Sequence, residues 1–184
     1  MKDLSRLASL VAFGSPLENQ KLNITVGVAF DQKTLSLEYL CQGDLTGVKW
    51  PELKTDPTRQ DNLWKQTCYE AFISWGNSPL YWELNVSPSG DWNLYSFDSY
   101  REGQALENRI EWIDIVDIQK SNHSQRMKLN LDLSPLLPLI KSSELCLGLS
   151  AILVREDHSQ TFWALDHKGD QPDFHLKNSF LIKL

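Results

Sequence analysis

Residues 81–97, YWELNVSPSGDWNLYSF, point to the fold class, because two short runs of alternating character flank a turn. The letters PSGD supply a proline, which fixes φ, and a glycine, which permits positive φ, so a β-hairpin is predicted here. Side chains of a strand alternate between two faces, which sets Glu83 and Asn85 opposite Trp82 and Leu84. The apolar face is expected to be core, whereas a carboxylate and an amide on the other face need a separate explanation.

Period-two alternation recurs along most of the chain and predicts about ten strands in total. Further strands are expected at residues 21–30, 34–41, 67–75, 110–118, 126–133, 145–154 and 179–184. The one expected helical turn is residues 134–140, SPLLPLI, with Ser134 placed to cap it and Pro135 at its first position. Many strands and almost no helix predict an all-β chain, namely an antiparallel β-sandwich of the jelly-roll or immunoglobulin-like kind with at most one short helix.

Length and composition set limits on the class of protein. A chain of 184 residues with 41% hydrophobic content is expected to form one domain, residues 1–184, with a full core. The formal net charge is −6, and the basic residues are scattered, so no nucleic-acid partner is expected. No apolar run approaches the roughly 20 residues that cross a bilayer, so no membrane partner is expected either.

Cysteine usage and the start of the chain predict a cytoplasmic protein. Cys41, Cys68 and Cys146 are odd in number, far apart and without CxxC spacing, which argues against a disulfide framework and against a zinc site. The apolar residues within residues 1–13 are interrupted by polar and charged ones, which makes this segment a poor signal peptide.

Two carboxylates lie in strands that are otherwise apolar. Glu70 belongs to residues 67–75 and Glu83 to the next strand, so they are predicted to face one another across a hairpin. A buried carboxylate costs several kcal/mol unless it is paired or hydrogen-bonded, so Arg101, Arg59 or a ligand must compensate it. Alternatively, the pair are the acid and the nucleophile of a glycosidase, which requires a separation of about 5 to 10 Å in an open cleft.

A second polar cluster is residues 162–175, FWALDHKGDQPDFH. His167 and His175 are eight residues apart, which fits no standard metal-ligand spacing, so no metal is expected. One interpretation is a loop in which Asp173 and His175 bond each other or the backbone. The other is a binding cleft lined by Trp163 and these polar groups, since a ligand needs a flat apolar surface with a few oriented hydrogen-bonding groups.

Three motifs in a fixed order carry a resemblance to a known family: residues 63–74 (LWKQTCYEAFIS), residues 81–103 and residues 162–175. Together they resemble the DOMON-like proteins of bacteria, which are similar in turn to family 9 carbohydrate-binding modules, over about residues 22–184. The resemblance implies a β-sandwich with a ligand site on one sheet, used elsewhere for sugars or haem, and no catalytic function. The matching positions are Trp64, Cys68, Glu70, Glu83, Asn85, Ser87, Pro88, Gly90, Trp92, Tyr100, Arg101, Trp163, Leu165, His167, Pro172, Asp173 and His175.

Two features depart from this family. Haem-binding DOMON domains hold iron with a Met and a His, but Met127 belongs to the apolar face of its strand, so haem is disfavoured and no cofactor is expected. Secreted carbohydrate-binding modules are attached to a catalytic domain behind a signal peptide, whereas this chain is expected to be free-standing and cytoplasmic. A role on extracellular polysaccharide is therefore not expected.

The leading hypothesis is a non-catalytic module that binds a small polar ligand, such as a carbohydrate. Glu83, Asn85 and Arg101 would hydrogen-bond ligand hydroxyls, and Tyr100 or Trp163 would stack on a sugar ring. The full candidate site is Glu70, Glu83, Asn85, Tyr100, Arg101, Trp163, His167, Asp173 and His175. The alternatives are the glycosidase and a purely structural role, in which the set Glu70, Glu83, Arg101, Asp173 and His175 forms a buried polar network.

Overall fold

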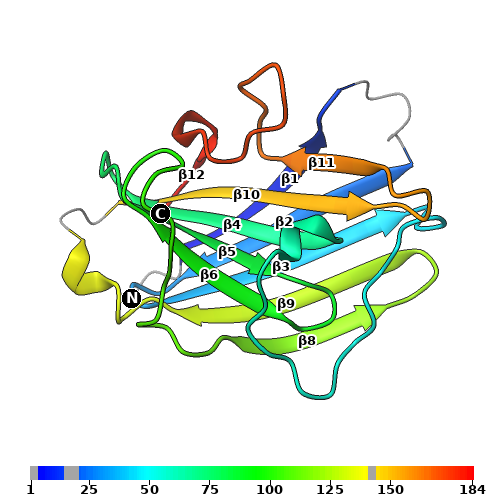
Figure 1. The fold of residues 1–184 in the computed structure, drawn as a ribbon, viewed down its shortest axis with the longest axis horizontal. Helices are drawn as coiled ribbons and strands as arrows, with labels where there is room; N and C mark the ends of the chain where they lie inside the picture. Colours follow the sequence, from blue (N-terminus) through cyan, green and yellow to red (C-terminus); the bar gives the residue numbers. More distant parts are fainter. Residues whose placement is uncertain (1–3, 15–20, 141–143) are drawn as a thin grey trace.

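The computed structural model describes residues 4–14, 21–140 and 144–184, and these form one curled antiparallel sheet (Figure 1). The strands are β1 (Leu4–Ala12), β2 (Leu22–Phe30), β3 (Thr34–Gly43), β4 (Cys68–Trp75), β5 (Tyr81–Val86), β6 (Trp92–Phe97), β7 (Ala105–Leu106), β8 (Asp114–Lys120), β9 (Ser124–Asp132), β10 (Leu145–Val154), β11 (Gln160–Ala164) and β12 (Ile182–Lys183). The prediction of an all-β, antiparallel chain is confirmed. The hairpin predicted at residues 81–97 is the β5–β6 pair.

The strand order is β7-β6-β5-β4-β10-β11-β1-β2-β3-β9-β8, with β12 also paired to β10. β1 joins the two halves of the sheet, because Leu4–Leu10 pair with β2 while Val11 and Ala12 pair with β11. The halves meet face to face: Tyr39 of β3 stacks on Tyr69 of β4 with ring centroids 4.7 Å apart. In Figure 1 the half with β4, β5, β6 and β10 accordingly lies across β2 and β3.

The core fills the space between the two halves. In β2 and β3 buried and partly exposed residues alternate, as expected for strands with one face on the core. β4, β5 and β10 are instead buried at every position. Their outer face carries a second, smaller apolar cluster, which includes Phe72, Tyr81, Phe97 and Phe180. The outer face is therefore covered, in part by the segment between β11 and β12, which carries Phe180. The candidate site lies beneath this cover.

Several elements differ from the prediction. β1, β7 and β11 were not expected, and β8 begins at Asp114, so residues 110–113 precede it. The start of the chain, read as a poor signal peptide, forms β1 from Leu4 onward; residues 1–3 lie outside the described residues. Three-residue 3-10 turns occur at Leu63–Lys65, Leu137–Leu139 and Lys177–Ser179, and the described residues contain no α-helix, which agrees with the prediction of at most one short helix.

The turn expected at residues 134–140 has a different start from the predicted one. It follows Leu136 without a side-chain cap, and the N–H of Ser134 donates to the carboxylate of Asp132 at 2.8 Å. Within the described ranges, no helix is long and apolar enough to cross a membrane.

Candidate functional site

A cavity of about 320 Å³ lies on the outer face of β4, β5 and β10. Its floor is the sheet. Its walls are the Leu63–Lys65 turn, the segment after β6, the strand β11 and the segment between β11 and β12, which runs from orange to red in Figure 1. The lining residues are Trp64, Glu70, Phe72, Glu83, Phe97, Arg101, Gln104, Ile152, Phe162, Pro172, Phe174 and His175. The cavity thus combines polar groups predicted from the sequence with aromatic groups that were not.

Strand register brings the polar residues together. Glu70 of β4 lies opposite Asn85 of β5 and Ser150 of β10. Glu83 lies opposite Phe72 of β4 and, on its other side, a tyrosine of β6. Because directly paired residues point to the same face, all of these side chains lie on the outer face of the sheet. Glu70 and Glu83 therefore share one face of adjacent strands, but the register does not place them directly opposite one another, as the sequence predicted; each lies diagonally across from the other.

Glu70 is buried, with 3% of its surface exposed. Ser150 donates a hydrogen bond from its hydroxyl to Glu70 Oε2 at 2.9 Å. Burial and the neighbouring charge of Glu83 raise the pKa of Glu70 to about 8. At neutral pH the Glu70 carboxyl therefore carries a proton, and it can both donate and accept hydrogen bonds.

Glu83 is 6% exposed and lies on the same strand as Asn85, two positions earlier. The Asn85 amide donates to Glu83 Oε1 at 2.8 Å, and His175 Nε2 lies 3.7 Å from Glu83 Oε2. Burial raises the pKa of Glu83, while the hydrogen bond from Asn85 and the charge of Arg101 act in the opposite direction. Asn85 itself is fully buried and does not line the cavity, so its contact is with Glu83 and not with a ligand.

His175 links the cavity to the loops. Its Nδ1 lies 2.8 Å from the Tyr81 hydroxyl, which also accepts the backbone N–H of Arg101 at 3.1 Å. Burial and the charge of Arg101 lower the pKa of His175 to about 4, so the imidazole is neutral at pH 7. If Tyr81 donates its O–H to Nδ1, the ring proton is on Nε2, which faces Glu83.

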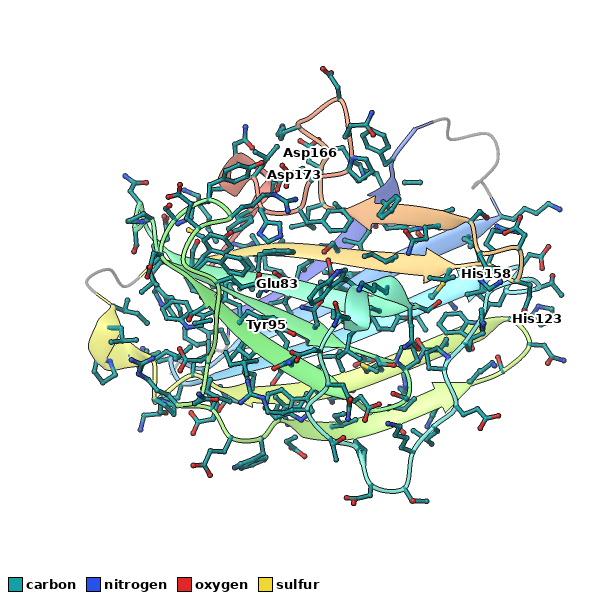
Figure 2. The ribbon with its side chains drawn as sticks, in the orientation of Figure 1. Glu83, Tyr95, His123, His158, Asp166 and Asp173 are labelled. Atoms are coloured by element: carbon teal, nitrogen blue, oxygen red, sulfur yellow. The ribbon has the colours of Figure 1, made fainter. Side chains whose placement is uncertain are left out.

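Asp173 fastens the two loops that form the wall. It accepts hydrogen bonds from Arg101 Nη2 at 2.9 Å, from the Tyr100 hydroxyl at 2.5 Å and from the backbone N–H of His175 at 3.1 Å. Figure 2 shows Asp173 on the loop after β11 and Glu83 on the sheet. These hydrogen bonds hold the pKa of Asp173 below its usual value despite its partial burial. Asp173 therefore positions Arg101 and His175 without lining the cavity.

Other predicted residues lie away from the cavity. Trp163 is 4% exposed and belongs to the main core on the opposite face, where its indole N–H donates to Thr161. His167 Nε2 lies 2.9 Å from the carbonyl oxygen of Val11 and does not line the cavity. Tyr100 is half exposed and contributes only through Asp173. Thus Glu70, Glu83, Arg101 and His175 share the cavity, and the rest of the predicted set does not.

Metal-ligating residues do not converge in the structure. Within residues 4–14, 21–140 and 144–184 no group of three or more His, Cys, Asp or Glu side chains is placed to hold a metal ion. Two of the histidines, His123 and His158, lie well away from Glu83 in Figure 2. Met127 is fully buried in the main core.

The predicted site residues include none of the Trp and Phe side chains of the cavity, although Trp64 is one of the positions that match the family motif. Five aromatic side chains line the cavity: Trp64, Phe72, Phe97, Phe162 and Phe174. The sequence contained a signal for two of these residues. Phe72 is two positions after Glu70 on β4, so both side chains point to the same face, and Phe97 of β6 pairs with Tyr81 of β5 in the predicted hairpin. Phe162 precedes Trp163 on β11, so the two point to opposite faces. Recognising β11 as a strand would have shown that only one of them can face the ligand.

Comparisons with known proteins give matches of structure only. A comparison with models of known protein families finds no match, and neither does a comparison with curated proteins. A solved structure of a candidate carbohydrate-binding protein from Bacteroides uniformis is similar over 95% of this chain and 84% of its own, with a TM-score of 0.69 and 12% identity. A family 9 carbohydrate-binding module from Caldicellulosiruptor kristjanssonii, in complex with cellotriose, is similar over 87% of this chain and 72% of its own, with a TM-score of 0.47 and 9% identity.

The likeness to the Bacteroides uniformis protein shows that this chain shares its fold. The resemblance of the three sequence motifs to DOMON-like proteins stays a prediction.

Proposed function

We propose that this protein is a non-catalytic carbohydrate-binding module, and that its ligand binds in the cavity on the outer face of β4, β5 and β10. One observation carries the proposal: the buried carboxyl groups of Glu70 and Glu83 and the partly buried His175 line a cavity together with five aromatic side chains. Ligand sites in general combine an apolar surface with a few oriented polar groups. A volume of about 320 Å³ suits a ligand of one or two sugar rings.

The hydrogen-bonding capacity of the cavity matches that of a sugar. A sugar hydroxyl both donates and accepts, and the cavity offers both kinds of partner. The protonated carboxyl of Glu70 can donate, the Nε2–H of His175 can donate, and Glu83 Oε2 can accept. Aromatic rings supply apolar surface for the C–H faces of a sugar ring. A sugar would also satisfy carboxyl oxygens that are costly to bury without a partner.

Two similarities support this proposal. The Bacteroides uniformis protein of the same fold is described as a candidate carbohydrate-binding protein. The three motifs resemble DOMON-like proteins, which are similar to family 9 carbohydrate-binding modules. A cytoplasmic location is part of the proposal, since Cys41, Cys68 and Cys146 are buried free thiols of the kind that persist in a reducing compartment.

Calorimetric titration of mono- and oligosaccharides tests the proposal, with a pair of tryptophan variants as probes. Trp64 lines the cavity, whereas Trp112 is 66% exposed and lines a different one. We expect Trp64→Ala to weaken binding about tenfold, equivalent to about 1.4 kcal/mol, and Trp112→Ala to leave it unchanged. No heat of binding for any sugar at millimolar concentration, or equal losses in both variants, would contradict the proposal.

One observation favours a second candidate, a glycosidase. Glu70 and Glu83 line the same cavity, and the pKa of Glu70, about 8, keeps it protonated as a general acid must be. This candidate predicts turnover of aryl glycosides that is lost in Glu83→Gln. Absence of turnover by the unmodified protein across α- and β-linked substrates removes it and leaves the binding module.

A further inference from the structure

We propose that the cavity selects a positively charged ligand, namely an amino sugar, over neutral sugars. The inference rests on the proposed function and specifies the ligand of that same site. It is carried by two buried carboxyl groups that line the cavity and form no salt bridge with a lysine or arginine among the described residues, and by the aromatic side chains around them.

The carboxyl groups lack a protein counter-ion. Among the described residues Glu70 makes no salt bridge, and only its Oε2 has a hydrogen-bond partner, the hydroxyl of Ser150. Glu83 has one basic neighbour within 4 Å, His175, and that imidazole is neutral at pH 7. Glu70 Oε1 and Glu83 Oε2 therefore remain open to a ligand. A buried carboxylate without a counter-ion is unfavourable, so a cation that enters the cavity gains by supplying one.

The nearest cationic side chain does not fill this role. Arg101 lines the rim of the cavity, but its Nη2 is bonded to Asp173 at 2.9 Å, and half of its side chain is exposed to water. Its charge lowers the pKa of Glu83 and of His175, but Arg101 is already paired with Asp173, and solvent weakens its effect on the two glutamates. Among the residues that line the cavity, Glu70 and Glu83 are the only acidic ones, and Arg101 and the neutral His175 are the only basic ones.

The aromatic walls favour the same class of ligand. An ammonium group within about 6 Å of a ring face is attracted by the negative charge of the π-system, and the effect grows when water is excluded. Phe72 and Phe97 are buried, whereas Trp64, Phe162 and Phe174 are partly buried. Carboxyl groups next to aromatic rings bind an organic cation more specifically than a neutral hydroxyl. A sugar ring that carries a protonated amine uses both features.

Charge complementarity predicts a coupled release of protons. A bound ammonium group would lower the pKa of Glu70 from about 8, so the carboxyl would lose its proton on binding at neutral pH. The groups that face this pair are Ser150, Cys68 and Tyr39 near Glu70, and Asn85, Tyr81, Tyr95, Arg101 and His175 near Glu83. Ser150 and Asn85 do not titrate, and His175 is already neutral. Burial raises the pKa of the Cys68 thiol and of the three tyrosine hydroxyls, so these groups keep their protons at neutral pH, and Glu70 is the expected source of the released proton.

Titration calorimetry at neutral pH tests this with three matched sugars, D-glucosamine, D-glucose and N-acetyl-D-glucosamine, and with cyclohexylamine as an amine that is not a sugar. We expect glucosamine to bind at least about tenfold more tightly than either neutral sugar. Its binding enthalpy should depend on the ionisation enthalpy of the buffer, because protons are released. The epimeric amino sugars, galactosamine and mannosamine, extend the panel.

Variants assign the effect to the carboxyl groups. Glu70→Gln should abolish the buffer dependence, and Glu83→Gln should remove the preference for the amine, while thermal melting confirms that each variant is folded. Glu111→Gln removes an exposed carboxylate outside this cavity and should change neither quantity. A preference that survives both cavity variants would overturn the inference.

The panel separates the two proposals. Equal binding of glucose and glucosamine overturns the selectivity for cations and leaves the carbohydrate-binding function standing. Binding of cyclohexylamine with no response to any sugar overturns the carbohydrate function and supports a site for organic cations. Silence of the whole panel overturns both.

Discussion

The free energy of unfolding should fall by about 2 kcal/mol between pH 6.5 and pH 8, because of Glu70. Its pKa is about 8 in the folded protein and near 4.5 for the free side chain, so the folded state holds a proton that the unfolded state has lost. Each bound proton of difference lowers the stability by about 1.4 kcal/mol per pH unit as pH rises. The loss is gradual near pH 8, since Glu70 then titrates in the folded state as well. The raised pKa of Glu83 acts in the same direction.

The pH window is chosen to isolate this effect. Between about pH 4 and pH 6.5 the lowered pKa of His175 has the opposite sign, because there the unfolded state binds the extra proton and stability rises with pH. Above pH 8 the buried thiols, whose pKa values are raised from 9.0, begin to contribute a fall of their own. Glu70 therefore dominates from pH 6.5 to pH 8.

Urea unfolding followed by tryptophan fluorescence measures this quantity, with Glu70→Gln as the control. The amide oxygen of glutamine can still accept the hydrogen bond from Ser150, but it cannot titrate. We expect the free energy of unfolding of the variant to change little between pH 6.5 and pH 8. At pH 8 and above the variant should be more stable than the unmodified protein. An unmodified protein whose stability stays level or rises across this window, or a variant with the same decline, would refute the assignment of a protonated, buried Glu70.

Three further changes have expected outcomes in the same assay. Asn85→Ala should cost about 1–3 kcal/mol, because it removes the amide that donates to Glu83 at full burial; a loss below about 0.5 kcal/mol would contradict it. Tyr81→Phe should cost a similar amount by removing a hydroxyl with two partners, and a neutral result would show that this network adds nothing. Gly148→Ala should cost about 1–3 kcal/mol, since its Cβ would lie 2.6 Å from Phe180 Cδ1; Phe180→Leu in the same chain should recover part of the loss.

The sequence predicted the strands with one face in the core and also β4, β5 and β10, which are buried on both faces. β2, β3 and β9 alternate between buried and less buried residues, and the alternation is plain in the amino-acid letters. β1 escaped detection because it carries apolar residues on its outer face too, with Leu7 78% exposed. β11 is five residues long and runs into a polar loop, which left no period to measure. β1 and β11 pair with one another, although the two segments are distant in the sequence. The local pattern of residues carries no information about such pairing.

The same limit explains the candidate site. The alternation of residues correctly placed Glu83 and Asn85 on one face of the strand. Only Glu83 lines the cavity, however, because Asn85 is fully buried. The difference comes from the loops that cover the sheet, and these are fastened by contacts over long distances in the chain, such as Arg101 with Asp173. Sequence spacing identifies the residues on a face, whereas the folded loops decide which of them a ligand can reach.

A structural role and a ligand-binding role predict different surroundings for the carboxyl groups of Glu70 and Glu83. A purely structural network would gain by pairing each carboxylate with an arginine, as Glu107 does with Arg109, and the pKa of Glu107 is indeed lowered. Glu70 and Glu83 instead have raised pKa values and lie beside an open volume. An arrangement that lowers stability at neutral pH and above is typical of a site whose missing partner is a ligand. A bound cation should therefore stabilise the protein more at pH 8 than at pH 6.5, because Glu70 is then more readily ionised.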